Sequence, residues 1–317
     1  MRLQQLRYLS EIVRQNLNLS KAAERLHTSQ PGISRQIQLL EEELGVTIFV
    51  RNGKRIVKLT PPGQAIIGIA EKMLKDAENL KQIGLEFSDS ASGELIIATT
   101  HTQARYALPP IIKRFTERYP KVKLILRQGS PTQISELVSS GEANLAIATE
   151  AIELFEELVM LPCYQWNRCI IVPPKHPLLR QQPVTLEAIA LYPIITYDFA
   201  FTGRSKINQA FESKKLTPNV VLTAIDADVI KTYVELGLGI GILAKMAFDP
   251  HRDKHLRAID ASHLFEASMT RIGISRNSYI RSYVYDFIEM FAPHLDQATV
   301  KAAMKSKHPR SSKNALE

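Results

Sequence analysis

The sequence predicts an α/β protein built from a small N-terminal head, one long helix and a larger body of two lobes. Three observations lead to this prediction. Residues 18–63 hold two short amphipathic helices followed by a basic hairpin. From Pro61 onward, apolar residues recur at helical spacing as far as Phe87. From residue 94, short apolar runs alternate with helical stretches, which is the pattern of α/β domains.

The head contains a pair of short helices joined by a tight turn. Ser20 is a suitable N-cap for the first helix, which would bury Ala22, Ala23 and Leu26. Ser29 can cap the second helix, and Pro31 is tolerated in its first turn. Apolar residues of the second helix recur at helical spacing and predict a buried stripe of Ile33, Ile37, Leu40 and Leu44.

The rest of the second helix is polar. Such side chains can hydrogen-bond base edges or phosphates, and this layout is typical of a recognition helix in a major groove. The candidate DNA-binding residues of this helix are Ser29, Gln30, Pro31, Ser34, Arg35 and Gln38. Spacing alone does not separate such a helix from an ordinary solvated polar face.

A basic hairpin follows in residues 50–55 (VRNGKR). Its Asn-Gly step is a strong hairpin signal. The tip carries the cations Arg51, Lys54 and Arg55. Such a tip suits a phosphate backbone or a minor groove, so we expect Arg51 and Lys54 to contact DNA. The helices and the basic wing together predict a winged helix-turn-helix domain over residues 1–60.

Positive charge is concentrated at the two ends of the chain. The net charge is +8, with +4 in residues 1–88, zero in residues 89–299 and +4 in residues 300–317. The tail, residues 301–317, is too polar to bury itself, and we expect disorder beyond its first residues. A solubility tail is the preferred interpretation of this charge, and weak, salt-sensitive attraction to DNA is the alternative.

Composition places the chain among cytoplasmic globular proteins. With 317 residues, 45% of them hydrophobic, it can form two or three domains. We expect no secretory leader and no membrane span, because no apolar run is long enough. Cys163 and Cys169 alone do not form a disulfide framework. We expect both to be core residues, with a redox sensor as the weaker alternative.

Residues 61–88 predict a single linker helix. Apolar or small residues recur at alternating spacings of four and three, at Ile66, Ala70, Met73, Ala77, Leu80, Gly84 and Phe87. This pattern is typical of a coiled-coil seam. Its place between head and body favours a dimerisation helix over a helix packed on its own domain. The polar stretch DSASG, residues 89–93, marks the start of the body, residues 89–300.

The body alternates strands and helices. The strand candidates are ELIIATT, VKLILRQ, NLAIATE, CIIVPP, PIITYD, VVLTAI, GIGILA and RIGIS. The helix candidates are PPIIKRFTERY, TQISELVSS, SKINQAFES and DVIKTYVEL. This order predicts parallel sheet made of right-handed crossover units. The length, about 200 residues, suits two lobes with a cleft between them.

Hydroxyl side chains gather at the predicted strand ends, where ligands bind in such sheets. The first strand leads into Thr102 and Gln103, another ends at Thr149, and a third leads to Thr202. Neutral donors of this kind suit a small anion, and Asp198 argues against a strongly cationic pocket. Each threonine by itself is as well explained as a strand or cap residue.

Other chemistry has little support. The glycines of ELGLGIGIL precede a strand and follow a helix, which is the reverse of a dinucleotide loop. His251 and His255 fall in a loop-like context that favours surface residues over metal ligands. Core packing is the default for Trp166. The sequence holds no Ser-His-Asp order, metal motif or Walker loop, so we expect neither an enzyme nor a metal site.

The chain resembles the LysR-type transcriptional regulators along nearly its whole length. The stretch SKAAERLHTSQPGISRQIQLLEEELGVTIFVR, followed by LTPPGQ, is similar to their N-terminal domain. The stretches IATTHTQARYALP, QGSPTQI, VMLPCYQWNR, FTGRS and TAIDADVIKTY resemble the CysB-like branch, which regulates sulfur assimilation and cysteine biosynthesis. The resemblance implies a two-lobed sensor with mixed sheets, like a periplasmic binding protein. It also implies a homodimer or homotetramer on promoter DNA, with RNA polymerase as a further partner.

The resemblance also implies a small effector and the residues that would bind it. The effector would be O-acetylserine, N-acetylserine, sulfate or thiosulfate, bound in the inter-lobe cleft. By motif, the effector-binding residues would be Thr100, Thr102, Gln103, Thr149, Tyr164, Trp166 and Thr202. No cofactor is implied. A regulator of sulfonate use that senses another sulfur metabolite is the alternative, and a solute-binding protein is a more distant one.

Overall fold

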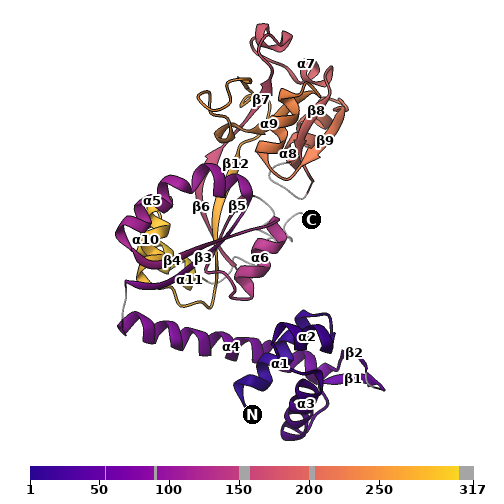
Figure 1. Ribbon diagram of the computed structural model, residues 1–317, viewed down its shortest axis with the longest axis vertical. Helices are drawn as coiled ribbons and strands as arrows, with labels where there is room; N and C mark the ends of the chain where they lie inside the picture. The colour runs from indigo at the N-terminus through magenta and orange to yellow at the C-terminus, as the bar shows by residue number, and fades with distance from the viewer. Residues whose placement is uncertain (54, 89–90, 150–157, 200–203, 307–317) are drawn as a thin grey trace, which may run out of the picture. The chain divides into compact units, whose positions relative to one another are not determined.

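The computed structural model describes residues 1–53, 55–88, 91–149, 158–199 and 204–306. These residues divide into two compact units. The first holds residues 1–87 with 277–279, and the second holds residues 88–276 with 280–317. Each unit is described by itself (Figure 1). Among the described residues, no helix is long and apolar enough to cross a membrane.

The first unit is a winged helix-turn-helix with a long C-terminal helix. Its elements are α1 (Leu3–Arg14), α2 (Leu19–Arg25), α3 (Gln30–Leu44), β1 (Phe49–Asn52), β2 (Arg55–Leu59) and α4 (Pro61–Ser88). The sequence did not identify α1, which contributes Leu6, Leu9 and Ile12 to the core of the head. Its apolar residues, among them Leu6, Leu9 and Ile12, do recur at helical spacing, so the pattern of this helix is present in the sequence.

Two details of the head differ from the expectation, and one confirms it. The N-cap of α2 is Asn18, whose Oδ1 accepts from the Lys21 backbone N–H at 3.0 Å, and Ser20 lies inside the helix. Ser29 does cap α3, as predicted, by accepting from the Gly32 N–H at 3.2 Å. Leu44 is not in the buried stripe but is exposed, because α3 ends there at Gly45, beyond the reach of the core.

The wing is the antiparallel pair β1–β2. Gly53 at its tip has a φ of +59°, a conformation that glycine adopts without strain. The start of α4 packs closely under the wing. A Cβ on Gly63 would lie 2.2 Å from the backbone oxygen of Ile48, so only glycine fits there.

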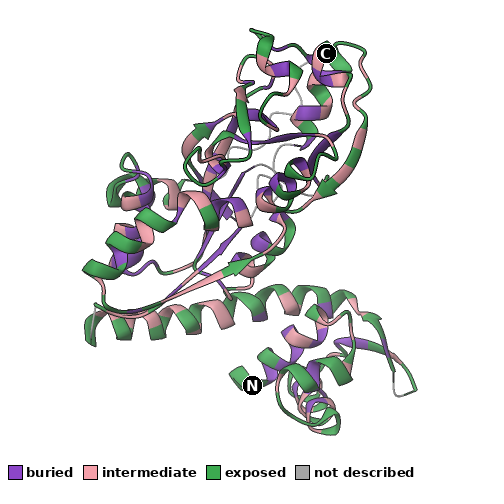
Figure 2. Ribbon diagram, turned by 45° about the horizontal axis from the view of Figure 1, so that its top comes forward, coloured by how far each residue is buried: buried purple, intermediate pink, exposed green. Residues whose placement is uncertain are grey.

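The linker helix packs partly on its own head. Ala70 is buried in the head core and Ile66 packs against it, so the first turns of the predicted seam are covered within the chain. Farther along, Met73, Leu80 and Phe87 are exposed. Figure 2 shows exposed and intermediate residues along most of α4. Pairing of two chains therefore stays a prediction for the part of the helix beyond Ala70.

The second unit has two lobes, each built on a five-stranded sheet. The strands of the first lobe lie in the order β4-β3-β5-β12-β6, and those of the second in the order β11-β7-β10-β8-β9. The strands are β3 (Ser92–Thr99), β4 (Lys121–Gln128), β5 (Leu145–Thr149), β6 (Leu158–Trp166), β7 (Arg168–Val172), β8 (Ile194–Tyr197), β9 (Val220–Ala224), β10 (Ile240–Ala244), β11 (Arg257–Asp260) and β12 (Ser268–Ser275). The lobes are joined where β6 leads into β7 and where β11 leads back to β12.

Helices cover the sheets on both faces. In the first lobe, α5 (Pro109–Arg118) and α10 (Ser282–Phe291) pack on one face and α6 (Pro131–Ser139) on the other. The remaining helices are α7 (Leu186–Ala190), α8 (Arg204–Ser213), α9 (Ala227–Glu235) and α11 (Gln297–Lys305). Every strand and helix candidate of the body forms.

The sheets are mixed, whereas alternation alone predicted parallel sheet. The strands β4, β3 and β5 are parallel, but β12 runs antiparallel to both β5 and β6. The sequence missed β6, whose alternation is interrupted by Pro162, as well as β11, α7, α10 and α11. The first residues of the tail belong to α11 and are therefore ordered in a helix.

Candidate functional site

The polar face of α3 presents the predicted DNA-binding side chains. Gln30, Pro31, Arg35 and Gln38 are exposed, whereas Ser34 is half-buried and Ser29 is engaged in its cap. Arg35 lies 3.9 Å from Glu42, and both side chains are more than 60% exposed. Such a pair contributes little to stability, so Arg35 is available to another anion. Contacts of these residues with DNA remain a prediction.

Within the chain, Arg51 holds the wing to α3. Its Nη2 donates to Glu41 Oε2 at 2.9 Å, and its side chain is only 26% exposed. The other oxygen of Glu41 accepts from the backbone N–H groups of Ile48 and Phe49 at 2.8 and 3.1 Å. One carboxylate thus ties the end of the recognition helix to the start of the wing. No local pattern in the sequence indicates this contact of Arg51, and Lys54 lies outside the described residues.

In the first lobe, three predicted effector residues and one that the sequence missed form a polar row. Thr149 on β5, Thr270 on β12 and Tyr164 on β6 are cross-strand partners in register. Thr149 and Thr270 are buried, and their hydroxyl oxygens lie 3.4 Å apart. Trp166, also buried, donates its indole N–H to Thr149 Oγ1 at 3.3 Å.

Gln103 joins this row from the loop after β3. Its side chain is 1% exposed, and it lies in η1 (Gln103–Ala107), one turn of π-helix. Tyr164 donates its phenol to Gln103 Oε1 at 2.6 Å, and Gln103 Nε2 donates to Thr270 Oγ1 at 3.2 Å. Thr270 therefore lies between Gln103 and Thr149. In the sequence, Thr270 is an ordinary residue of the strand SMTRIGIS, so its residue type alone did not mark it as part of a site.

The other predicted effector residues are placed nearby or fall outside the description. Thr100 and Thr102 are buried directly after β3. Thr102 hydrogen-bonds the phenol of Tyr197 on β8, so it contacts the second lobe. Burial raises the pKa of Tyr197 to about 12, which keeps the phenol neutral. Thr202 lies outside the described residues.

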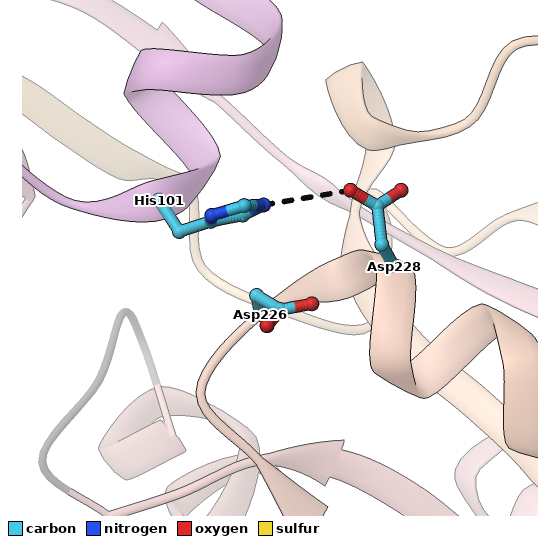
Figure 3. A group of neighbouring side chains, drawn as sticks. All are labelled: His101, Asp226 and Asp228. Carbon is cyan, nitrogen blue, oxygen red and sulfur yellow. Dashed lines mark hydrogen bonds and ion pairs between the residues drawn. The ribbon is translucent and has the colours of Figure 1, made fainter. Parts of the chain in front are cut away.

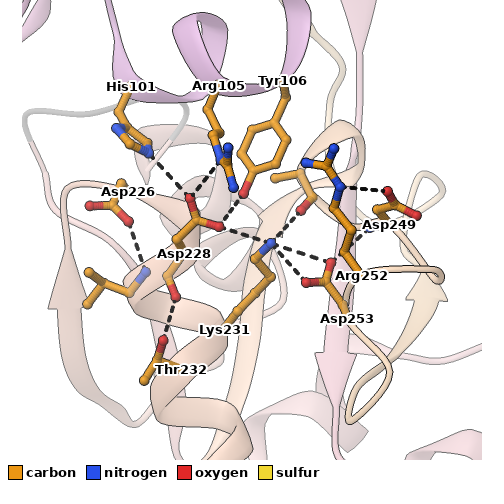
Figure 4. Close-up of polar contacts among 12 residues, drawn as sticks. His101, Arg105, Tyr106, Asp226, Asp228, Lys231, Thr232, Asp249, Arg252 and Asp253 are labelled. Carbon is orange, nitrogen blue, oxygen red and sulfur yellow. Dashed lines mark hydrogen bonds and ion pairs between the residues drawn. The ribbon is translucent and has the colours of Figure 1, made fainter.

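A second polar network joins the lobes around Asp228 at the start of α9 (Figure 4). Three side chains from the β3–α5 connection reach this carboxylate. Tyr106 donates its phenol to Oδ1 at 2.6 Å, and Oδ2 lies 3.4 Å from His101 Nε2 and 3.5 Å from Arg105 Nε. Within the second lobe, Lys231 Nζ lies 3.1 Å from Asp228. The network thus connects the segment that holds Gln103 to the second lobe.

The titration of this network follows from its contacts. Burial would raise the pKa of the Asp228 carboxyl, but hydrogen bonds with Tyr106, Lys231 and His101 and the charge of Lys231 lower it to about 2. Burial and the hydrogen bond to Asp228 raise the pKa of Tyr106 to about 12. Burial would lower the pKa of Lys231, but hydrogen bonds with Tyr106, Asp253 and Asp228 raise it. Near neutral pH, Asp228 and Lys231 are therefore charged and Tyr106 is neutral.

The same region holds a group with metal-ligand geometry. The ligand atoms of His101, Asp226 and Asp228 lie within 4.8 Å of one another (Figure 3). However, Asp226 Oδ1 caps α9 by accepting from the Val229 N–H at 2.9 Å. Both oxygens of Asp228 already contact donors, among them the cationic Lys231. The arrangement is better suited to ion pairing than to holding a divalent cation.

Cys163 lies on β6 and Cys169 on β7, the two strands of the first crossing between the lobes. Burial raises the pKa of both Cys163 and Cys169 to about 12, so both are thiols near neutral pH. Cys169 is buried and Cys163 partly so, and neither is in a disulfide. A protonated thiol is a poor nucleophile, which argues against a redox role and agrees with core packing.

Comparison with known families matches both units. Residues 3–64 match the family described as "Bacterial regulatory helix-turn-helix protein, lysR family". Residues 88–296 match the family described as "LysR substrate binding domain". The second match alone covers more than half of the chain.

Individual relatives agree with these matches. The chain is 56% identical over 305 residues to the HTH-type transcriptional regulator SsuR of Burkholderia cenocepacia, covering 96% of this chain and 99% of the relative. It is 51% identical over 317 residues to the HTH-type transcriptional regulator CysB of Haemophilus influenzae, covering 100% and 98%. The crystal structure of the cofactor-binding domain of the Cbl transcriptional regulator is 45% identical, with a TM-score of 0.66, covering 68% of this chain and 95% of that one.

Proposed function

This chain belongs to the LysR family of transcriptional regulators, and from that premise we propose how it works. It is a DNA-binding regulator of sulfur-assimilation and cysteine-biosynthesis genes, not an enzyme. Its head binds promoter DNA through α3 and the wing. Its sensor binds a small sulfur-pathway metabolite that is anionic or zwitterionic. As a homodimer or homotetramer in the cytoplasm, it acts together with RNA polymerase.

The buried polar row of the first lobe carries the proposal for the effector. Gln103, Thr149, Thr270, Tyr164 and Trp166 supply amide, hydroxyl, phenol and indole groups, and none of them is charged. An acceptor-rich ligand such as sulfate, thiosulfate, O-acetylserine or N-acetylserine matches a donor set of this kind. Neutral donors hold an anion without the strong salt dependence of an arginine cluster.

The position of Gln103 suggests how effector binding reaches the DNA. Gln103 and Tyr106 both lie in η1, a five-residue turn. A ligand held by Gln103 and Thr102 would set the orientation of that turn. Tyr106 and Arg105 on the same turn contact Asp228 of the second lobe. Effector binding would therefore bias the contact between lobes, and with it the pairing of subunits on the promoter.

A panel of four compounds tests this function. Sulfate, thiosulfate, O-acetylserine and N-acetylserine are added in turn to the full-length protein, and its melting temperature is recorded. A ligand that binds the native state raises the melting temperature by mass action. Gel shifts then compare promoter DNA of cysteine-biosynthesis genes with unrelated DNA. Failure to prefer the promoter, together with no shift by any compound, would contradict the proposal.

The same gel shifts address the alternative that the protein controls sulfonate use. The high identity to SsuR, 56%, is the observation that keeps this alternative open. Promoters of sulfonate-use genes serve as a second set of targets. A preference of at least about tenfold for one set, which corresponds to about 1.4 kcal/mol, assigns the regulated genes.

A further inference from the structure

We propose that Thr270 is a positioning residue that orients the Gln103 amide toward the effector. The inference rests on the proposed function of the polar row as an effector site. Thr270 was not among the residues that the sequence singled out, and its side chain is 0% exposed. Its role is to hold the Gln103 amide, because its hydroxyl oxygen already contacts Gln103 and Thr149.

The hydrogen bonds fix which way the Gln103 amide faces. The phenol of Tyr164 donates to Oε1 at 2.6 Å, so the amide oxygen faces that side. Nε2 donates to Thr270 Oγ1 at 3.2 Å, which uses one of its two N–H groups. Among the described residues Nε2 has no second acceptor, so its other N–H can donate to a ligand. Without Thr270 the amide would lose the contact that holds its nitrogen.

The hydroxyls of the row bond to one another and to their neighbours. The indole N–H of Trp166 can only donate, so Thr149 Oγ1 is the acceptor in that bond. Thr270 Oγ1 likewise accepts from Gln103. Only one of the two threonines can donate to the other across their 3.4 Å contact. The Thr270 hydroxyl also hydrogen-bonds the phenol of Tyr164, so the row can use its hydroxyl hydrogens internally.

A bulge in β6 brings Tyr164 into this row. Thr270 pairs with Tyr164, but Arg271 pairs with Pro162, so β6 has one extra residue at Cys163. The odd-numbered Val159 and Leu161 and the even-numbered Tyr164 all pack in the same core. The extra residue has therefore shifted which side chains of β6 face that core. In a regular strand Tyr164 would share a face with Leu158 and Met160, which pack under α6. Bulges re-aim side chains in this way beside functional sites.

A double-mutant cycle tests the inference. Thr270→Val removes the hydroxyl with little change of shape, and Gln103→Ala removes the amide that it holds. Calorimetry measures the affinity of each variant for whichever of the four compounds binds the wild type most tightly. We expect each single variant to weaken binding about tenfold, the effect of one lost hydrogen bond. The double variant should bind no more weakly than Gln103→Ala, because Thr270 acts through Gln103.

Three further variants complete the test. Thr270→Ser keeps the hydroxyl and should bind within about twofold of the wild type. Thr99→Val removes another buried hydroxyl of the same sheet, which donates to the Ile147 carbonyl at 2.8 Å. It should lower the melting temperature but leave the affinity unchanged. Thr270→Ala takes the place of Thr270→Val in the cycle if that variant does not fold.

The outcomes separate this inference from the function on which it rests. Losses that multiply in the double variant, or wild-type affinity in Thr270→Val, would overturn the positioning role alone. If none of the four compounds binds the wild type, the proposed effector class is wrong and this inference falls with it. Non-additive losses with rescue by Thr270→Ser support it.

Discussion

Removing the Glu41 carboxylate should destabilise the DNA-binding head. Glu41 Oε1 accepts from the backbone N–H groups of Ile48 and Phe49, and Oε2 accepts from Arg51. Ile48 and Phe49 are 0% exposed, so water cannot readily replace the lost acceptor. The Glu41→Ala variant leaves two shielded backbone donors without a partner and frees the wing from α3.

The magnitude follows from these contacts. Each buried donor that loses its acceptor costs about 1–3 kcal/mol, and the partly exposed ion pair with Arg51 adds less than about 1 kcal/mol. The head should lose roughly 2–7 kcal/mol in its free energy of unfolding. At about 1.4 kcal/mol per tenfold change, amide hydrogens of the wing should exchange about 30-fold faster or more.

Hydrogen exchange read by mass spectrometry is the suitable assay. It reports on the head separately, whereas the single tryptophan, Trp166, lies in the sensor. Glu41→Gln keeps an acceptor for the backbone and should show a smaller effect. Glu42→Ala is the matched control, because Glu42 is mostly exposed and its ion pair with Arg35 is long, at 3.9 Å. Equal exchange in the wings of Glu41→Ala and Glu42→Ala would refute this role of Glu41.

Three more predictions concern the other parts of the chain. Gln30→Ala should weaken binding to cognate DNA by about 1–3 kcal/mol while leaving binding to random DNA almost unaffected. An unchanged ratio of cognate to random affinity in anisotropy titrations would exclude Gln30 from base recognition. Leu80→Glu should reduce the assembly of subunits measured by sedimentation, with little effect on the fold, since Leu80 is 70% exposed in the single chain. Lys81→Glu is its control. An intact oligomer of Leu80→Glu would exclude this part of α4 from the interface. The pKa of Asp228 is lowered to about 2, so its contribution to stability is complete above the unfolded pKa of about 4 and is lost as pH falls toward 2. Acid unfolding followed by Trp166 fluorescence should therefore be steeper in this pH range for the wild type than for Asp228→Asn, and identical curves would contradict the inter-lobe role of Asp228.

Elements with a strong local pattern could be predicted from the sequence. The recognition helix has a capping serine and an apolar stripe, and the body strands are apolar runs bounded by polar residues. Elements that depend on distant partners could not. The strand β6 carries Pro162 and a bulge, and its place beside β12 depends on pairing across more than a hundred residues. Parallel and antiparallel pairs give the same local pattern, so the mixed sheets were not predictable from alternation.

The candidate sites show the same division. Strand-end threonines and Gln103 could be named in sequence order, but the residue that joins them could not. Thr270 becomes informative only because register places it opposite both Thr149 and Tyr164. Arg51 was predicted as a DNA contact from its charge and its place in the wing. Its bond to Glu41 depends on how the wing folds back on α3.

A sulfur-pathway metabolite bound in the sensor should change how the head binds promoter DNA. Fluorescence anisotropy of labelled promoter DNA, titrated with the full-length protein with and without the tightest-binding compound, tests it most directly. We predict that the compound changes promoter affinity by about fivefold or more, and that saturating promoter DNA changes the affinity for the compound by the same factor. Promoter affinity that stays the same at saturating compound would contradict the account.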